Sequence, residues 1–379
     1  MKVIHVCNHF YPCIGGIETS VQSICSELIK HGHKSDVVCL NKCSNSNSIL
    51  KPYERYRNIN IYRLPYINLK FYKVAPKVLK IIKRYDLIHV HGVGFFADFL
   101  ASTKQIHKKP LILSTHGGIF HTKHIKNIKK IYFGILGKTV LKQFDRIIAV
   151  SEEDKKLFLR ATVKDKIIVI PNGINYNKLS KIKRRQVKNT FIYIGRISKN
   201  KRADRLIETM SYLKGKVPEA KLYIIGKDWE GLKGKLENNV KKAGLNSHVF
   251  FTGELEERQL IKYLSKAQFF VSASEYEGFG ISVIEAMACG IIPILNNIKQ
   301  FKNLIRNNKE GFIVNFSDPS KCANLIRNIT NMNLGGIRLN SKKKAKYFDW
   351  NNVTNKLLKL YSEITHNYPS TRKYLWKRF

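Results

Sequence analysis

The sequence predicts an α/β protein of two domains, each built on a parallel sheet with helices on both faces. Short apolar segments alternate with segments whose apolar residues recur every three or four positions, and this alternation starts again near residue 190. The chain has 379 residues, enough for two cores of ordinary size.

The first domain is predicted for residues 1–170. A strand, KVIHV, leads through the loop CNHFYPCIGG into a helix in which Ile17, Val21, Ile24 and Leu28 recur at helical spacing. Further segments of strand length are SDVVCL, INIYRL, DLIHVHG, PLILSTHGG, DRIIAVS and KIIVIPNG. Apolar strands of this kind are typical of a parallel sheet that is buried on both faces.

The second domain is predicted for residues 171–345, after the turn Pro171-Asn172-Gly173. The basic segment KLSKIKRRQVKN is interpreted as a linker or an exposed loop. The strand candidates are TFIYIG, AKLYIIG, HVFFTG, AQFFVSAS, IIPIL and GFIV, and helices are predicted at 203–213, 231–243, 256–266 and 281–289. Residues 346–379 close the chain with an amphipathic helix, FDWNNVTNKLLKLYSEI, and a basic tail.

Charge is the unusual feature of the composition. The chain has 68 Lys and Arg against 27 Asp and Glu, a net charge of +41, so anionic partners are expected: nucleic acid, anionic lipid or phosphorylated small molecules. A compositional bias toward Lys, Ile and Asn is the alternative cause. The seven cysteines form no C-x-x-C pair, which predicts reduced, mostly buried thiols in the cytoplasm. Neither a signal peptide nor an apolar run of membrane-spanning length is recognised.

Chemically informative residues follow the predicted strands. In doubly wound sheets, ligands bind beyond the carboxyl ends of the strands, so a site is expected in a cleft between the two domains. The loops in question are CIGG, HGG, GRISKNK and EGFG. The sequence contains neither G-x-G-x-x-G after the first strand of either half, nor a P-loop, nor a D-x-D pair. We therefore expect no cofactor and no metal, and protein groups that neutralise a phosphate.

Arg196 and Lys201, just past a strand, are the candidate phosphate ligands. The turn Gly278-Phe279-Gly280 precedes a helix whose amino end favours an anion. Each feature has an alternative interpretation. Arg196 and Lys201 could be two ordinary cations of a basic chain, and the glycine turn could be a tight turn without a ligand. Glu277 and Glu285 lie on either side of that turn and suit the hydroxyls of a sugar and a ribose. A sugar nucleotide carries both hydroxyl groups and phosphate.

The whole chain resembles retaining glycosyltransferases of the GT-B fold, in the large fourth family. SEYEGFGISVIEAMACGIIPI resembles the family's E-x7-E signature, GRISKNK its phosphate loop and GGIE its amino-terminal glycine loop. IPNGI resembles its interdomain hinge, and FDWNNVTNKLLKLY its returning carboxyl-terminal helix. The implied fold has two Rossmann-like, doubly wound parallel-sheet domains facing a cleft.

The resemblance implies a role for each candidate residue. Glu285 binds the nucleotide ribose and Glu277 the donor sugar, while Arg196 and Lys201 hold the diphosphate. Gly16 and the amides of Phe279 and Gly280 assist, and His116 in STHGG contacts the donor sugar. For His116, a purely structural role is the alternative. The chain departs from the commonest pattern at Arg202, where the family usually has Gly, and this weakens the assignment of Lys201. The family is thought to retain configuration by same-face attack, with the departing phosphate accepting a proton.

STHGGIFHTKHIKNIKKIYF resembles a loop of α-mannosyltransferases that use GDP-mannose and polyprenyl-diphosphate-linked saccharides. The segment from Lys123 to Lys142 carries six Lys and no acid, with apolar residues at helical spacing. It predicts docking on anionic lipid, hence a peripheral protein at the inner face of the cell membrane, with a lipid-linked or glycan acceptor. A core helix with a solvated outer face is the alternative.

Two other functions compete with the transferase. A nucleotide-sugar epimerase has the same fold and binds the same donor, but it would release an epimerised nucleotide sugar. The net charge suggests a nucleic-acid-binding protein, but no RNA-binding module with interleaved aromatic residues is recognised.

Overall fold

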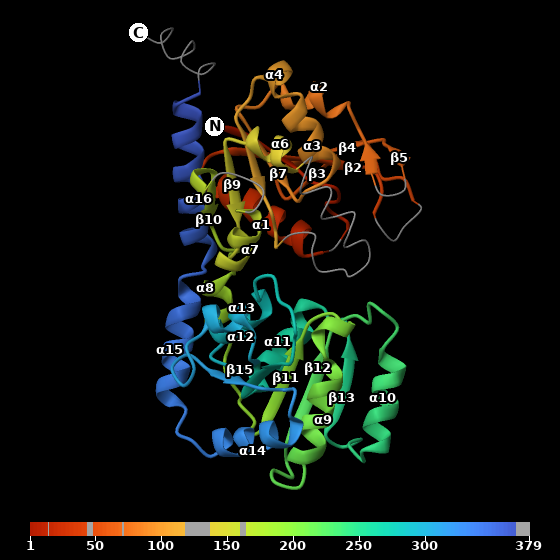
Figure 1. The fold of residues 1–379 in the computed structure, drawn as a ribbon, viewed down its shortest axis with the longest axis vertical. Helices are drawn as coiled ribbons and strands as arrows, with labels where there is room; N and C mark the ends of the chain where they lie inside the picture. Colours follow the sequence, from red (N-terminus) through yellow and green to blue (C-terminus); the bar gives the residue numbers. More distant parts are fainter. Residues whose placement is uncertain (14, 44–47, 70–71, 118–136, 160–163, 369–379) are drawn as a thin grey trace. The chain divides into compact units, whose positions relative to one another are not determined.

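The structure, a computed structural model, describes residues 1–13, 15–43, 48–69, 72–117, 137–159 and 164–368. It divides the chain into two compact units (Figure 1). The first unit consists of Met1–Gly173 together with Trp350–Phe379, and the second consists of Ile174–Asp349. Each unit has its own sheet and its own hydrophobic core.

The first unit contains an eight-stranded sheet with the order β10-β9-β8-β7-β1-β2-β4-β3. The strands are β1 (Lys2–Val6), β2 (Lys34–Leu40), β3 (Tyr53–Tyr56), β4 (Ile59–Leu64), β7 (Leu87–His91), β8 (Leu111–Ser114), β9 (Arg146–Ala149) and β10 (Ile167–Val169). All neighbouring pairs are parallel except β3 and β4. The prediction of a purely parallel sheet is therefore wrong at this edge. Arg57 and Asn58 both have positive φ angles and form the tight turn that reverses the chain there.

Helices cover both faces of this sheet. They are α1 (Gly16–Lys30), α2 (Val78–Ile82), α3 (Phe95–Ser102), α4 (Lys104–His107), α6 (Gly137–Lys142), α7 (Glu152–Phe158) and α16 (Trp350–His366). A separate hairpin is formed by β5 (Ile67–Leu69) and β6 (Tyr72–Val74). One face of the sheet packs Ile88 and Val90 against α3, and the other packs Val3 and Leu87 against α1 and α16.

Helix α16, blue in Figure 1, completes the first unit although it is the last helix among the described residues. Its buried residues share one core with Val3 and Leu87 of the sheet and with Ile24 and Leu28 of α1; they are Val353, Leu357, Leu360, Tyr361 and Ile364. Their spacing of three and four residues places them on one helical face. The amphipathic pattern of this segment is thus the result of packing within the first unit.

The second unit contains a six-stranded parallel sheet with the order β13-β12-β11-β14-β15-β16. Its strands are β11 (Thr190–Ile194), β12 (Lys221–Ile225), β13 (Val249–Gly253), β14 (Phe269–Ser272), β15 (Ile292–Asn296) and β16 (Phe312–Val314). Its helices are α8 (Tyr176–Ser180), α9 (Ala203–Leu213), α10 (Lys233–Lys242), α11 (Glu257–Lys266), α12 (Ile281–Ala288), α13 (Lys299–Leu304), α14 (Pro319–Thr330) and α15 (Gly335–Lys346). The strand order reverses between β11 and β14, so the loops that follow these two strands flank a topological switch point.

The segment interpreted as a linker, residues 178–189, is fixed to the second unit. The guanidinium of Arg184 donates to the carbonyls of Leu264 and Ala267, and burial lowers the pKa of Arg184 to about 10. The backbone N–H of Asn189 donates to Gln268 Oε1 at 2.7 Å. Of the two interpretations, a linker and an exposed loop, the first is wrong and the second is confirmed: most residues of the segment are exposed, and Arg184 holds it to carbonyls at the end of α11.

The prediction of reduced cysteines is wrong for one pair. Cys13 and Cys43 form a disulfide, while Cys7, Cys25, Cys39, Cys289 and Cys322 are free and buried. The two bonded residues lie in loops that follow β1 and β2, which are neighbours in the sheet. Parallel neighbours bring the loops at their carboxyl ends together, and this explains how residues 30 apart in the sequence meet.

The predicted basic stripe lies, from Lys123 to residue 136, outside the described residues, and its last part forms α6. Among the helices of the described part of the chain, none combines the length and the apolar character needed to cross a bilayer.

Candidate active site

Arg196 follows β11 at the switch point of the second unit. Its guanidinium carbon lies 4.9 Å from the ring centre of Trp229, in the loop that follows β12. Trp229 is half exposed, so the ring forms a platform on which the planar cation stacks. Sequence reasoning found Arg196 but missed Trp229. The signal was an isolated aromatic residue in the loop after the neighbouring strand.

The two loops that flank Arg196 approach each other closely. Gly226 follows β12 with a φ of +144°, and a Cβ atom at this position would lie 2.0 Å from the carbonyl oxygen of Gly195. Only glycine permits this approach. The loops carrying Arg196 and Trp229 are therefore held together by their backbones.

Lys201 and Glu277 form an ion pair across the switch point. Lys201 Nζ lies 2.6 Å from Glu277 Oε2, and the side chains are 15% and 20% exposed. Lys201 ends the short 3-10 helix η3 (Lys199–Lys201) after β11, whereas Glu277 lies in the loop after β14. The structure thus brings together two of the residues that the sequence assigned to one site.

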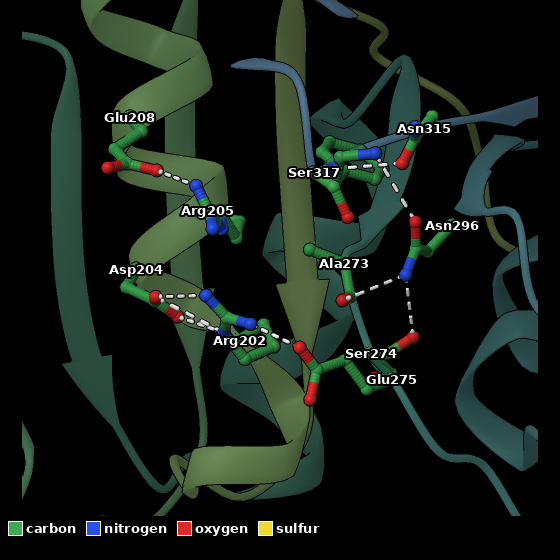
Figure 2. Close-up of polar contacts among 11 residues, drawn as sticks. Arg202, Asp204, Arg205, Glu208, Ala273, Ser274, Glu275, Asn296, Asn315 and Ser317 are labelled. Carbon is green, nitrogen blue, oxygen red and sulfur yellow. Dashed lines mark hydrogen bonds and ion pairs between the residues drawn. The ribbon is translucent and has the colours of Figure 1, made fainter.

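Arg202 shows what happens at the departure from the family pattern. Its φ and ψ angles, 52° and 46°, lie in the left-handed region that glycine adopts most easily. Its guanidinium bonds to Asp204 and to Glu275 (Figure 2). The turn therefore has the geometry expected of glycine, and the Arg side chain adds an ion pair between the loop of Lys201 and the loop of Glu277.

The loop of Glu277 is joined to the loop of Lys201 through the backbone, and to the segment after β16 through Asn296 on β15. The N–H of Glu275 donates to the carbonyl of Asn200 at 2.9 Å. Asn296, at the end of β15, donates to the carbonyl of Ser274 at 3.1 Å and accepts from the N–H of Phe316 at 3.3 Å (Figure 2). Sequence reasoning missed Asn296, whose only signal was a polar residue at the end of an apolar strand.

The turn Gly278-Phe279-Gly280 positions the amino end of α12. Gly280 has a φ of +96° and is the residue immediately before the helix. Phe279 is buried and packs edge-on against Phe348, and Gln300 Nε2 donates to its carbonyl at 3.1 Å. The first N–H groups of α12 are consequently held at the switch point, where a helix amino end favours an anion.

Glu285 lies on α12, two turns beyond Glu277. Burial raises the pKa of its carboxyl to about 7, and the charge of Glu257 adds to the effect. A carboxyl with this pKa changes its charge near neutrality and is poised to accept hydrogen bonds from hydroxyl groups when it is ionised.

Gly16 and His116 belong to the first unit. Gly16 is the first residue of α1, and a Cβ atom there would meet nothing within 4 Å. The local fold alone therefore does not require glycine at this position. His116 follows β8 with a φ of +52°, and burial lowers the pKa of its imidazole to about 4. It is a neutral imidazole near pH 7.

Three more histidines extend from His116 into the sheet. His116 Nε2 lies 2.9 Å from His91 Nδ1, and His91 Nε2 lies 2.9 Å from His5 Nδ1. His89 contacts the Tyr361 hydroxyl at 2.6 Å and the Ser114 hydroxyl at 2.7 Å. Sequence reasoning missed this cluster, although alternate histidines in IHVHG indicate one face of a strand.

His5, His89 and His91 are also the group of nitrogen ligands that comes closest to a metal site among the described residues. Both nitrogens of His89 and both of His91 already have hydrogen-bond partners. Ligation of a metal by all three histidines would have to break these bonds. The arrangement fits a hydrogen-bonded chain better than it fits a metal centre.

Comparison with known proteins identifies the class. Residues 14–178 match the family described as Glycosyltransferase Family 4, and residues 176–347 match Glycosyl transferases group 1. GDP-mannose:cellobiosyl-diphosphopolyprenol alpha-mannosyltransferase of Xanthomonas campestris is 33% identical over 95% of this chain and 96% of its own length. The enzyme of that name from Komagataeibacter xylinus is 30% identical over 96% and 93%. The chain therefore belongs to the family 4 glycosyltransferases and is an enzyme.

Solved structures agree on the fold. The crystal structure of Anabaena HepE in complex with UDP superimposes with a TM-score of 0.77 over 96% of this chain and 100% of that chain, at 18% identity. Both units of this chain are Rossmann-like, as the GT-B fold requires. The predicted fold class is confirmed.

Proposed function

We propose that this enzyme transfers a mannosyl residue from GDP-mannose to a polyprenyl-diphosphate-linked saccharide, with retention of configuration. The observation that carries the proposal is the full-length similarity to relatives of that name, at 30–33% identity. The loops at the switch point of the second unit support it, because they supply a cation, a carboxylate and a helix amino end.

Each candidate residue receives a role in this proposal. Glu285 accepts hydrogen bonds from the ribose hydroxyls and Glu277 from the sugar hydroxyls. Arg196, stacked on Trp229, and Lys201 bind the diphosphate together with the amide groups of Phe279 and Gly280. In the first unit, Gly16 leaves room for the donor and His116 contacts its sugar.

The charge of the leaving group explains the mechanism. Cleavage of the anomeric bond leaves a nucleoside diphosphate with growing negative charge beside an oxocarbenium-like sugar. Arg196, Lys201 and the amino end of α12 stabilise that charge because they are fixed before the reaction. The departing phosphate accepts the proton of the acceptor hydroxyl, and the acceptor attacks from the same face.

A donor screen tests the activity. Purified enzyme is incubated with GDP-mannose, UDP-glucose or UDP-galactose and a polyprenyl-diphosphate-linked disaccharide, and release of the nucleoside diphosphate is measured. We expect release from GDP-mannose that depends on the acceptor. An epimerised nucleotide sugar without diphosphate release would instead support the epimerase.

We also propose that the reaction needs no metal, since two cations and a helix amino end are available to neutralise the diphosphate. Turnover should persist after dialysis against EDTA. Complete loss of turnover that Mg²⁺ restores would contradict this part of the proposal.

The enzyme is further proposed to act at the inner face of the cell membrane, where it binds anionic lipid. The net charge of +41 and the exposed apolar residues Ile67 and Leu69 on β5 support this. Replacement of Lys126, Lys129 and Lys130 of the basic stripe by Gln should weaken binding to anionic liposomes by roughly 3 kcal/mol at low salt, at about 1 kcal/mol per residue.

Three exposed lysines of α10 provide the matched control: Lys235, Lys241 and Lys242. Their replacement by Gln removes the same charge from the second unit. Equal loss of liposome binding in both triple variants would indicate a nonspecific effect of net charge. Equal loss of turnover on a short soluble acceptor and on the lipid-linked acceptor in the stripe variant would indicate that the stripe is part of the protein core or of the cleft wall.

A further inference from the structure

Three histidines of the first unit form a continuous hydrogen-bonded chain that ends at His116, one of the candidate site residues. His5 on β1 and His91 on β7 are buried, and His116, just past β8, is partly exposed. The two contacts between rings, His5 Nδ1 to His91 Nε2 and His91 Nδ1 to His116 Nε2, are both 2.9 Å long. The chain uses both nitrogens of His91.

Each contact in such a chain needs one N–H and one lone pair. A neutral imidazole has a single N–H, so the tautomer of one ring fixes the tautomers of the others. The rings are neutral near pH 7, because burial lowers the pKa of His5 to about 3 and of His116 to about 4, and that of His91 well below its usual value. Only two arrangements of the protons are therefore possible: each ring donates to the next from His5 through His91 to His116, or each donates in the reverse order.

The buried end of the chain selects one direction. His5 Nε2 is buried and has no hydrogen-bond partner among the described residues. If the chain ran from His116 toward His5, this nitrogen would carry an unpaired buried N–H, and such groups are rare in folded proteins. In the opposite direction, His5 Nε2 carries only a lone pair.

We infer that His5 and His91 are positioning residues that hold His116 in the tautomer with its proton on Nδ1. His5 Nδ1–H donates to His91 Nε2, and His91 Nδ1–H donates to His116 Nε2. The remaining N–H of His116, on Nδ1, is then available as a donor to a hydroxyl oxygen of the donor sugar. This inference rests on the proposed role of His116 and names two further residues on which that role depends.

The neighbouring pair of His89 and Tyr361 provides a control within the same cluster. His89 bonds to Tyr361 and Ser114 and does not belong to the chain. Replacement of Tyr361 by Phe removes one buried hydrogen bond beside the chain and leaves the three chain members in place.

The tautomer can be measured directly in the full-length protein. Long-range ¹H–¹⁵N spectra of protein labelled with [¹⁵N]histidine distinguish protonated from unprotonated ring nitrogens, and the His116→Gln variant assigns the signals of His116. We expect an Nδ1–H tautomer for His116 in the wild-type protein at pH 7. An Nε2–H tautomer, or rapid exchange between the two, would overturn the inference, and no substitution within the buried chain is needed for this result.

Two amide variants test the consequence for turnover. The side-chain nitrogen of Asn occupies the position of histidine Nδ1, so His91→Asn keeps a donor toward His116, while Gln places its amide nearer the position of Nε2. We expect His91→Gln to lower kcat about tenfold, the scale of one lost hydrogen bond, with less than a threefold change in donor KM. His91→Asn and Tyr361→Phe should each stay within threefold of wild-type kcat.

Equal losses in His91→Asn and His91→Gln, together with an unchanged His116 tautomer in both, would show that His91 is only structural and would overturn the inference. Failure of the proposed function would give a different experimental result. In that case, wild-type enzyme would release no nucleoside diphosphate in the donor screen, whereas the tautomer of His116 would still be measured.

Discussion

Lys201 Nζ lies 2.6 Å from Glu277 Oε2, so the cation proposed for the diphosphate and the carboxylate proposed for the sugar neutralise each other. A bound diphosphate competes with Glu277 for Lys201. The two residues are therefore coupled, and a change in one alters the charge that the other offers to the donor.

Replacement of Glu277 by Gln should separate binding from turnover. The substitution releases Lys201 from a charged hydrogen bond, so GDP alone should bind as well as in the wild type or up to about tenfold more tightly. Turnover should fall because the hydroxyls of the donor sugar lose the carboxylate that accepts their hydrogen bonds. Calorimetry with GDP and steady-state kinetics check the two effects, and weaker GDP binding in this variant would contradict the assignment.

Glu285 should make donor binding depend on pH. Its carboxyl is protonated below its pKa of about 7. Ribose hydroxyls donate most strongly to the ionised form, so the Kd of GDP should tighten roughly tenfold between pH 6 and pH 8. Binding isotherms at several pH values test this, and Glu285→Gln should bind more weakly with a flat profile.

The Glu285 carboxyl should affect folding stability in the opposite way: donor binding strengthens as pH rises, whereas the contribution of this carboxyl to stability decreases. The pKa in the folded state is above the ordinary value of 4.5, so its contribution is most favourable below pH 4.5 and is lost as pH rises through 7. Glu285→Gln should therefore raise the free energy of unfolding by up to about 3 kcal/mol at pH 8. The increase should be smaller at pH 5. An equal change at both values would indicate that burial does not perturb this carboxyl.

Arg202 should be replaced by Gly more easily than by Ala. Its left-handed conformation costs about 1 kcal/mol for a residue with a Cβ atom. Its partly exposed ion pairs with Asp204 and Glu275 stabilise the protein by no more than about 1 kcal/mol. Denaturant unfolding should place Arg202→Ala about 1 kcal/mol below Arg202→Gly. Both variants lack the ion pairs, so the reverse order would show that the left-handed backbone does not determine stability at this turn.

The stack of Arg196 on Trp229 predicts two losses of different size. Arg196→Ala should lower kcat/KM by the equivalent of about 3 kcal/mol, the scale of one lost donor to a developing anion. Trp229→Leu keeps the cation but removes the ring beneath it, so the loss should be about 1 kcal/mol. Equal losses would indicate that the ring itself contacts the donor.

The disulfide predicts a stability difference that depends on the redox state. Cys13 and Cys43 close a loop with a sequence separation of 30, so Cys43→Ser should lower the free energy of unfolding by about 2–4 kcal/mol without reductant. The difference should vanish in excess dithiothreitol, which reduces the wild type as well. A wild-type protein with seven titratable thiols after unfolding without reductant would contradict the bond.

Local pattern was sufficient for most of the fold and insufficient for the contacts between loops. Strands such as KVIHV and TFIYI are mostly apolar, so they are visible in the sequence. Strand β3, YERY, lacks such a run and is formed only because a turn at Arg57 and Asn58 pairs it with β4.

The same distinction applies to the candidate site. Arg196, Glu277 and Glu285 belong to motifs with fixed spacing, whereas Trp229 and Asn296 reach the site because their strands are neighbours of β11 and β14. The partners of His116 depend likewise on β7 lying beside β1. The order of strands in a sheet is a tertiary property, and no local pattern encodes it.

The assignment of α16 to the first unit determines the order in which a growing chain can finish folding. The second unit is a continuous insertion whose ends meet, since Ile174 pairs with Asp349 and the N–H of Ile174 donates to the carbonyl of Phe348 at 2.7 Å. Synthesis from the amino end usually lets the earlier domain fold first. Here the first domain still lacks helix α16, including the buried Tyr361, when all residues of the inserted domain have been synthesised. The first domain therefore completes its core only after the whole of the second domain has been synthesised.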